Sequence, residues 1–467
     1  MRRDRDQLSA VFPYRNEIET ILSGQDFRCV AGAEDVRFKS WQTQSQMGVH
    51  MDRRTFNTAL LSAATTSAIG YGSAAADGRT VLYQSVGDRL IQWDVDVDAA
   101  TLTTRGSLTL PSNIQYVWPH PSRNYLYVST SDAASGNAPN PGKVHRLCAL
   151  SVDATGAISM HGEPAQLPQR PIHNSADAHG EYAFTCYNNP SNLTVHRINS
   201  DGSVGAQLPQ EAKLDLGIFA HQILAMPSNR SVIMVTRGNR PEGNKAEDPG
   251  ALKVYAFKGG QLSPLANLPV GGNGGLGYGP RHLDFHSSQP WVYVSVESQN
   301  ELHMHRIDGD SLSSEPLYKK RSTIGTYDIT FPQSAGAIHI HPNGRTLYVS
   351  NRASATVDFN GKKVFQGGEN NIAVFSINSK TGEPTLIQNE DPQSFHIRTF
   401  SIDPSGRILV AASITDMNVR DGDNIRHVPA ALTVFRIGED GKLALARKYD
   451  VELGGKFQWW TGLVHLV

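Results

Sequence analysis

One short pattern recurs seven times along this chain of 467 residues. Each copy is a polar turn, rich in proline, serine, asparagine or glycine, followed by a strand in which apolar and β-branched residues alternate. The copies are GRTVLYQS from Gly78, HPSRNYLYVS from His120, AHGEYAFTCY from Ala178, MPSNRSVIMVT from Met226, HSSQPWVYVS from His286, HPNGRTLYVS from His341 and DPSGRILVAAS from Asp403. A repeat of this kind restricts the chain to architectures that are built from seven equivalent units.

The spacing between the copies indicates the size of each unit. The apolar residues at the strand centres lie roughly 45 to 62 residues apart, and they are Val81, Leu126, Ala183, Ile233, Val292, Leu347 and Leu409. This spacing fits a four-stranded blade, and helical periodicity is nearly absent after residue 76. The sequence therefore predicts an all-β fold, a seven-bladed β-propeller over residues 77–467. A β-sandwich is the alternative, but sandwiches rarely repeat one strand-turn-strand unit seven times.

Closure of the ring requires both ends of the propeller to share one blade. Residues 457–467, FQWWTGLVHLV, have the apolar pattern of a last strand, and we expect them to join the blade that begins near Arg79. A ring that closes on itself leaves only short, protected sheet edges. We therefore expect a monomer.

Composition excludes two classes of partner. The chain carries 43 Lys plus Arg against 44 Asp plus Glu, without a dense basic stripe, so nucleic acid is not an expected partner. No apolar run reaches the length of a membrane span, so we do not expect a membrane protein. Of the three cysteines, Cys148 and Cys186 have no metal-ligand spacing; they can pair in an oxidising compartment or be buried thiols, and we favour unpaired burial.

The first 76 residues differ from the repeats. Residues 51–76 begin with Met51, continue through Arg53 and Arg54 into small, weakly apolar residues, and end in three alanines. This order resembles a twin-arginine export signal, which predicts a periplasmic or secreted protein, with a cytoplasmic protein as the alternative. Since an export signal normally opens a chain, we interpret residues 1–50 as an upstream extension or a disordered leader.

Ionisable residues recur at matched distances from the strand centres. Arg281 and Arg398 each lie eleven residues before a centre, whereas Glu297 and Arg352 each lie five residues after one. A hairpin folded near Gln289 brings Arg281 and Glu297 to the same end of one blade. Because the first strand of every blade lines the central channel, we predict that these four side chains converge at the channel mouth and bind an anion.

Three histidines precede neighbouring strand centres at similar distances. His221, His282 and His339 lie twelve, ten and eight residues before their centres, and we expect them to approach the same rim. Four other histidines are expected to be structural, because histidines inside strands and turns most often are. These are His286, His303, His305 and His341.

Three segments carry a resemblance to a known family. GPRHLDFH…VYVSVE (279–297), GAIHIHPNGRTLYVSNR (336–352) and FHIRTFSIDPSGRILVAAS (395–413) are similar to the seven-bladed propeller lactonases, which include bacterial 6-phosphogluconolactonases and fungal 3-carboxy-cis,cis-muconate lactonising enzymes. The similarity covers about residues 79–445. It implies a channel-mouth site without a metal or cofactor. The catalytic residues it implies are His221, Arg281, Glu297 and Arg352, with His282, His339 and Arg398 as substrate-binding neighbours.

These residue types fit the opening of a lactone ring. A base must activate water, a cation must stabilise the oxyanion, and an anchor must hold the acidic group of the substrate. Arginines suit the last two tasks, and Glu297 or His221 can carry the proton. The expected partner is a small anionic lactone or dicarboxylate. Two alternatives stay open, a muconate-type lactonising cycloisomerase and a propeller that binds a ligand without catalysis.

Overall fold

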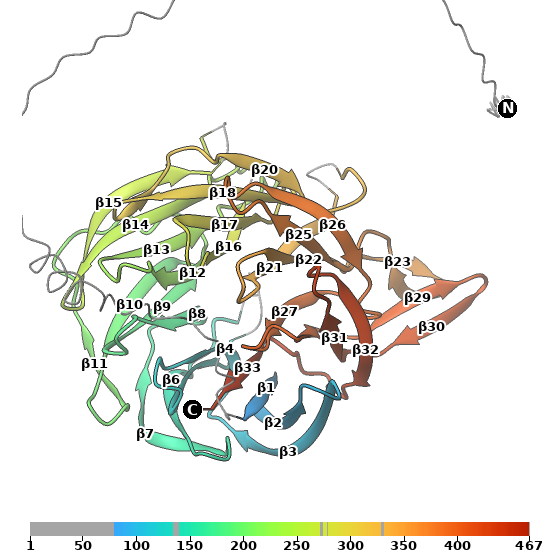
Figure 1. Ribbon diagram of the computed structural model, residues 1–467, viewed down its shortest axis with the longest axis horizontal. Coiled ribbons are helices and arrows are strands. Elements are labelled where there is room, and N and C mark those ends of the chain that lie inside the picture. Colours follow the sequence, from blue (N-terminus) through green and yellow to red (C-terminus); the bar gives the residue numbers. More distant parts are fainter. Residues whose placement is uncertain (1–78, 134–139, 271–273, 278, 328–330, 467) are drawn as a thin grey trace, which may run out of the picture. The chain divides into compact units, whose positions relative to one another are not determined.

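Seven small sheets surround one axis in the computed structural model of this protein (Figure 1). The structure describes residues 79–133, 140–270, 274–277, 279–327 and 331–466, and these contain strands and loops but no helix. The prediction of an all-β, seven-bladed propeller is confirmed. The predicted leader and export signal, residues 1–76, lie outside the described residues and stay predictions. The described residues contain no helix with the length and hydropathy of a membrane span.

Each blade is an antiparallel sheet with one strand at the channel and the last at the outer rim. The innermost strands are β33 (Thr461–His465), β4 (Asn113–Pro119), β8 (Pro171–Ala176), β12 (Ala220–Ala225), β16 (Pro280–Phe285), β21 (Gln333–Ile340) and β27 (Ile397–Ile402). The second strands are β1 (Thr80–Val86), β5 (Tyr125–Ser131), β9 (Tyr182–Asn188), β13 (Ser231–Thr236), β17 (Trp291–Val296), β22 (Thr346–Ala353) and β28 (Ile408–Ser413).

The outer half of each blade follows in chain order. The third strands are β2 (Arg89–Asp96), β6 (His145–Val152), β10 (Ser191–Ile198), β14 (Ala251–Lys258), β18 (Glu301–Asp308), β25 (Asn371–Ile377) and β31 (Ala431–Ile437). The outermost strands are β3 (Thr101–Thr109), β7 (Ile158–Gln166), β11 (Val204–Leu208), β15 (Gln261–Pro269), β26 (Pro384–Glu390) and β32 (Leu443–Asp450), with the short β19 (Ser311–Leu312) and β20 (Tyr318–Arg321) in the fifth blade.

The second strands form the cores between blades. All seven predicted strand centres lie on them and are at most 2% exposed. Because each sheet packs face to face against its neighbours, both faces of a second strand are covered, which explains its nearly continuous apolar sequence. Tyrosines of the second strands join the blades: Tyr83 donates a hydrogen bond to the carbonyl of Gly156 in the next blade (2.7 Å), and Tyr293 donates one to the carbonyl of Gly382 (2.7 Å).

Histidines at the inner turns make a second connection between blades. The Nδ1 atom of His341 accepts a hydrogen bond from the amide of Asn343 in its own turn, so the proton lies on Nε2, which donates to the carbonyl of Gly406 in the next blade at 2.8 Å. His286 makes the same contact to Gly344 at 2.9 Å. Both histidines are therefore structural, as predicted.

The C-terminal strand closes the ring. β33 pairs antiparallel with β1, with Val464 opposite Val81, and becomes the innermost strand of the first blade. The prediction of shared terminal strands is confirmed. Cys148 and Cys186 are both free and buried, so the preference for unpaired thiols is also confirmed, and burial raises the pKa of Cys148 to about 12.

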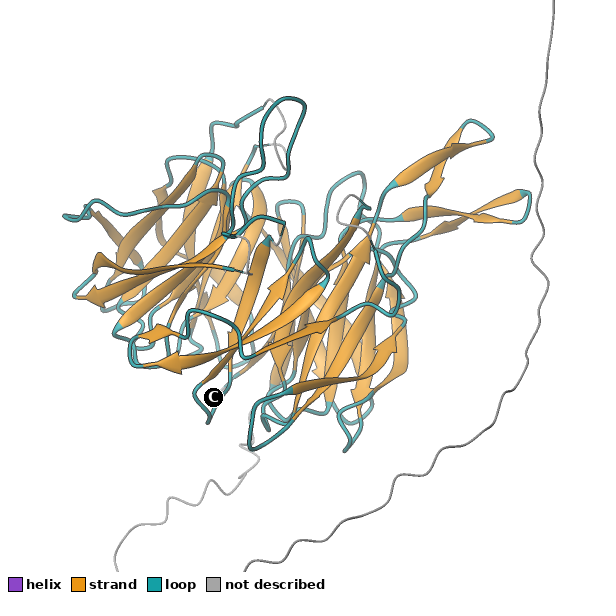
Figure 2. Ribbon diagram, turned by 90° about the horizontal axis from the view of Figure 1, so that it is seen from above, coloured by secondary structure: helices purple, strands orange, loops and turns teal. Residues whose placement is uncertain are grey.

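Two hairpins extend from neighbouring blades. β23 (Thr356–Phe359) with β24 (Lys362–Phe365), and β29 (Met417–Asp421) with β30 (Asn424–Val428), are inserted after the second strands of blades six and seven. They lie side by side, and the Asn418 side chain donates to the Lys363 carbonyl at 3.4 Å. Figure 2 shows both projecting beyond the sheets. They extend from the same end of the blades as Arg352.

Candidate active site

A β-bulge directs one polar side chain from each of three inner strands into the channel. The pairing of β12, β16 and β27 with their second strands is interrupted at His221, Arg281 and Arg398, which are the extra residues. A bulge leaves its extra residue without a partner across the ladder and re-aims the side chain. The three residues therefore occupy equivalent positions at one end of the channel.

The backbone before each bulge has a left-handed residue. Two positions upstream of these residues, Phe219, Gly279 and His396 have φ values of 58°, 62° and 56°. Only glycine adopts this conformation without a steric cost, so the chain accepts strain at Phe219 and His396. This repeated turn fixes how the chain enters each inner strand and hence where the bulged side chain lies.

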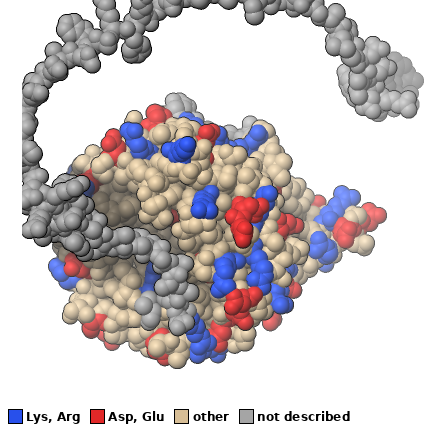
Figure 3. Space-filling view, viewed as in Figure 1, with Lys and Arg blue, Asp and Glu red and all other residues tan. Residues whose placement is uncertain are grey.

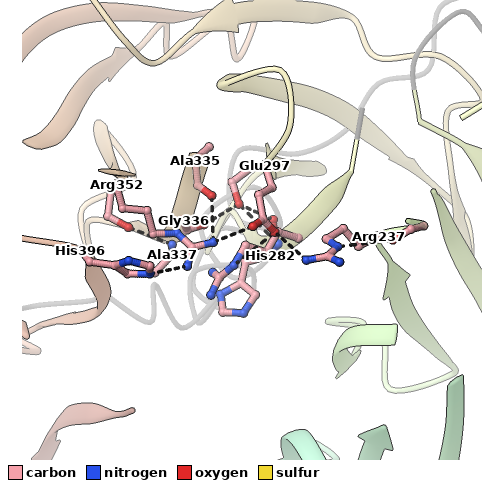
Figure 4. Close-up of polar contacts among 12 residues, drawn as sticks. Arg237, His282, Glu297, Ala335, Gly336, Ala337, Arg352 and His396 are labelled. Carbon is pink, nitrogen blue, oxygen red and sulfur yellow. Dashed lines mark hydrogen bonds and ion pairs between the residues drawn. The ribbon is translucent and has the colours of Figure 1, made fainter. Parts of the chain in front are cut away.

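The residues that face these bulged side chains come from the ends of three second strands. Arg237, Glu297 and Arg352 lie at equivalent positions, and both arginines and Arg281 contact the one carboxylate (Figure 4). The Nη2 atom of Arg352 donates to Glu297 Oε1 at 3.0 Å, whereas Glu297 Oε2 lies 3.8 Å from Arg281 Nε and 3.9 Å from Arg237 Nη1. Arg281 and Arg352 are only 1% and 6% exposed. The predicted convergence of Arg281, Glu297 and Arg352 is present, although their catalytic roles stay predictions.

Burial and charge act on Glu297 in opposite directions. Burial favours the neutral acid, but Arg352, Arg237 and Arg281 outweigh it and lower the pKa of this carboxyl. Glu297 is therefore a carboxylate at neutral pH. Its Oε2 atom has no hydrogen-bond partner among the described residues, so it can accept one from water or a substrate hydroxyl.

His396 completes the Arg352 side of the cluster. Its Nε2 atom lies 3.2 Å from Arg352 Nη1, and because an arginine can only donate, this nitrogen must accept. The ring is then neutral, with its proton on Nδ1. Burial and the charges of Arg352, Arg398 and Arg281 lower the pKa of His396 well below its ordinary value, which agrees with this assignment.

The other predicted histidines lie deeper in the channel. His221 and His282 contact each other with ring centroids 5.0 Å apart, and both are about 5% exposed. Burial and Arg281 lower the pKa of both rings well below the ordinary value, so both are neutral. The ring centroid of His173, a residue that was not predicted to belong to the site, lies 6.1 Å from that of His282.

His339 lies further along the channel than His221 and His282 but close enough to His282 to lower the pKa of that ring, and its expected role in substrate binding stays a prediction. It lies opposite Tyr348 on β21, at the blade position that Asp284 occupies on β16, two residues further from the mouth than His282. Its Nδ1 atom is 3.9 Å from Asp284 Oδ2, and its ring contacts Phe400. His339 lies two residues closer to its strand centre than His282 does, and each residue of a strand advances the position along the channel.

Arg398 adds an unpaired cation to the site. Its guanidinium lies over the ring of Trp459, 4.5 Å from the centroid, and no described acidic side chain pairs with it. Burial and the charges of Arg352 and Arg170 lower its pKa to about 9. On the face that Figure 3 shows, basic and acidic side chains are interspersed, so the arginines of the channel do not continue a basic outer surface there.

A pocket of about 670 Å³ opens beside this cluster. Arg237, Glu297, Arg352 and His396 line it, together with loop residues 238–242 and 188–191. His221, Arg281, His282 and Arg398 do not line it and lie behind the lining residues. Among the described residues, no group of three or more His, Cys, Asp and Glu side chains could hold a metal ion.

Two pocket residues, Arg237 and His396, were missed in the sequence. The predicted strand centre of the fourth blade lies one residue too far along: Val232, which pairs with Ala225 as Val292 pairs with Phe285, is the equivalent of Val292, and Ile233 is not. Counted from Val232, Arg237 is five residues further on, the offset of Glu297 and Arg352. His396 lies within the segment FHIRTF, but nothing in its spacing distinguishes it from the structural histidines.

Comparison with known proteins agrees with the fold. The family described as Lactonase, 7-bladed beta-propeller matches residues 80–421. The 6-phosphogluconolactonase of Erwinia tasmaniensis is 28% identical over 375 residues, 77% of this chain and 93% of that protein, and that of Pectobacterium carotovorum is 26% identical over 78% and 94%.

Among solved structures, the Pseudomonas aeruginosa periplasmic gluconolactonase PpgL has a TM-score of 0.62 at 17% identity, covering 84% of this chain and all of that one. This similarity concerns the fold. The family match runs from β1 to β29, so it covers blades two to six completely, three strands of the first blade and the inner two strands of the seventh. The chain therefore belongs to the lactonase family of seven-bladed β-propellers.

Proposed function

We propose that this protein hydrolyses a lactone that carries an anionic group, in the pocket around Glu297 and Arg352. As a member of the lactonase family it is a lactone hydrolase of the 6-phosphogluconolactonase type. The proposal concerns the location of the reaction and the charge of the substrate. The excess of arginine over carboxylate supports it most, because Arg237, Arg281 and Arg352 surround one glutamate and Arg398 has no acidic partner.

The cluster contains the groups that ring opening needs. A water molecule that donates to Glu297 Oε2 would face the pocket, where it could attack the lactone carbonyl. The oxyanion that forms would lie near the guanidinium of Arg352 or Arg237, which line the pocket, and the charge of Arg281 would add to the stabilisation from beside Glu297. The leaving alkoxide stays attached to the product and takes up a proton, so the step consumes one water and yields a hydroxy acid.

Arginine charge favours electrostatic stabilisation over strong base catalysis. A general base is most effective when its pKa is close to the working pH, and the three arginines lower the pKa of Glu297. His396 cannot act through Nε2 while Arg352 donates to it. We therefore assign Glu297 the orientation and partial deprotonation of water, and assign the arginines most of the stabilisation of the transition state.

A pair of lactones tests the proposal. The purified full chain is assayed with 6-phosphogluconolactone and with uncharged gluconolactone, and we expect kcat/KM to be at least about tenfold higher for the phosphorylated lactone because one charge-assisted contact contributes that much. Equal or faster hydrolysis of the uncharged lactone would refute the role of the anionic group. Consumption of a muconate with no lactone hydrolysis would favour the lactonising alternative.

The strained turn before Arg281 gives a second prediction. Gly279→Ala places a Cβ at a left-handed position, 2.6 Å from Ser298 Oγ. We expect a loss of about 1–2 kcal/mol in the free energy of unfolding, measured with urea, because an L-residue at positive φ costs that much. We also expect kcat to fall by about tenfold or more, since a small shift of Arg281 misplaces its charge.

Gly309→Ala is the matched control. Gly309 has a φ of 61° but no atom within 4 Å of the added Cβ, and it lies in the outer turn between β18 and β19. The two variants should lose similar stability, but only Gly279→Ala should lose activity. A Gly279→Ala protein with normal kcat would show that the turn does not position the site.

A further inference from the structure

A second, smaller pocket lies at the same end of the channel, among blades one to three. It has a volume of about 190 Å³, and none of the described aspartates or glutamates lines it. Its walls are formed by Gly87, Asn113, Gln115, Ala133, Arg170, Gly455, Lys456, Phe457 and Trp459. Gln115 is the bulged residue of β4, and Arg170 lies two positions before the bulge of β8, where other blades have Gly279 and His396. The two pockets share no lining residue.

Arg170 is a buried cation with no compensating charge. Arg170 is only 9% exposed. Among the described residues, its Nε atom has no hydrogen-bond partner and no side chain forms an ion pair with it. Burial lowers its pKa to about 10. A buried guanidinium without a partner is costly, so an anion that entered this pocket would offset an existing penalty.

The neighbouring groups complete a donor set for oxygen atoms. The guanidinium of Arg170 lies 5.9 Å from the centroid of Trp459, the same ring that Arg398 covers at 4.5 Å. This contact limits the orientation of both guanidiniums. Gln115 contributes an amide, which donates to the Asn113 carbonyl at 3.1 Å. Lys456 is less available, since its Nζ lies 2.6 Å from Asp88 Oδ1.

We propose that this pocket is a binding site for a monophosphate group, held by Arg170. The volume equals that of several water molecules at about 30 Å³ each, enough for a phosphate and part of its hydration shell. An arginine fork matches the geometry of two phosphate oxygens. The phosphate can be free in solution, or it can belong to a lactone whose ring lies in the pocket lined by Glu297. In both cases the recognition by Arg170 is the same.

Calorimetric titration of the full chain with inorganic phosphate tests the site. We expect saturable binding to the wild type and a Kd that rises by about 10- to 100-fold in Arg170→Met, because a hydrogen bond to a charged group contributes that much. Methionine keeps the length of the aliphatic stem, and a thermal melt verifies the fold. Arg230→Met is the control, since Arg230 is exposed and already paired with Asp310 at 2.8 Å. The same Kd in Arg170→Met and the wild type, or no saturable binding, would overturn the proposal.

A competition experiment distinguishes the two sources of phosphate. The wild type and Glu297→Gln are titrated with 6-phosphogluconate in the presence and absence of inorganic phosphate. Displacement of the sugar acid by phosphate, together with weaker sugar-acid binding in Arg170→Met, assigns the site to the phosphate group of the substrate. Simultaneous binding assigns it to free phosphate. The phosphate titration does not depend on lactone hydrolysis, so it can succeed even where the proposed location of the reaction fails.

Discussion

Replacing Glu297 by glutamine is expected to lower kcat for lactone hydrolysis by about 10² to 10⁴, the contribution of a positioned acid or base. The amide keeps the size of the side chain but removes the charge that three arginines surround. It also replaces one acceptor oxygen by a donor, so a water at the former Oε2 position loses its orientation. Steady-state kinetics on the preferred lactone measure the effect.

The variant must be shown to be folded at the assay temperature. Removing the carboxylate that Arg237, Arg281 and Arg352 share leaves charges uncompensated, which can cost about 3–5 kcal/mol. Thermal melts by circular dichroism therefore accompany the kinetics. Glu383→Gln is the control, because Glu383 pairs with Lys320 at 2.6 Å at the outer part of blade six. A folded Glu297→Gln enzyme with normal kcat would remove Glu297 from the mechanism.

The pH dependence of kcat/KM in the wild type tests the protonation state of Glu297. Because its pKa is lowered below the ordinary value of 4.5, the carboxylate is present above that pH and is lost only as the pH falls through the lowered value. His221, His282 and His396 are also neutral from well below pH 6.5 upwards. We therefore expect kcat/KM for uncharged gluconolactone, which has no phosphate that titrates near pH 6, to be nearly constant between about pH 5 and 8. An acid limb near pH 6.5 would indicate a histidine base with an ordinary pKa.

Much of the fold could be predicted because each repeat is recognisable from short stretches of apolar and turn-forming residues. The alternation of apolar residues places Leu126 or Leu347 on a covered strand, and a polar turn rich in proline, serine, asparagine or glycine precedes each second strand. Counting residues from the strand centres also brought Arg281 and Glu297 together, since a two-stranded hairpin leaves little freedom of register. Because the same strand-turn-strand pattern occurs seven times, a pattern that identifies one hairpin also predicted the whole ring.

The remaining parts of the site depend on features that counting does not include. The unbroken apolar run Val232–Val235 placed the predicted strand centre of the fourth blade one residue too far along and concealed Arg237. The bulges at His221, Arg281 and Arg398 add a residue to the inner strand and none to the second strand, so they change which side chains point inward without changing the apolar pattern. His396 owes its place to a left-handed backbone, and Trp459 to the closing segment of the ring, neither of which follows from the repeat.

The buried arginines of the channel lower the stability of the fold, but their charge can stabilise the transition state. Arg281 is 1% exposed, its Nε and Nη1 atoms lack hydrogen-bond partners, and burial together with Arg352 and Arg398 lowers its pKa. A cation so placed is poorly compensated by a carboxylate 3.8 Å away that it shares with two others. Active sites often retain such unfavourable groups because the charge that develops in the transition state stabilises them.

Arg281→Met should therefore separate the two effects. We expect the free energy of unfolding to stay the same or rise, since a hydrophobic side chain of similar length replaces a poorly paired charge. We expect kcat/KM to fall by about 10² to 10³, the usual loss of one oxyanion-stabilising group. Urea denaturation and steady-state kinetics on one preparation measure both quantities. Arg281→Lys retains the charge but not the planar fork, so its kcat/KM should lie between the wild type and Arg281→Met. If Arg281→Met unfolded the protein, or left kcat/KM unchanged, the arginine would be structural and the transition-state charge would have to be held by Arg352 and Arg237 alone.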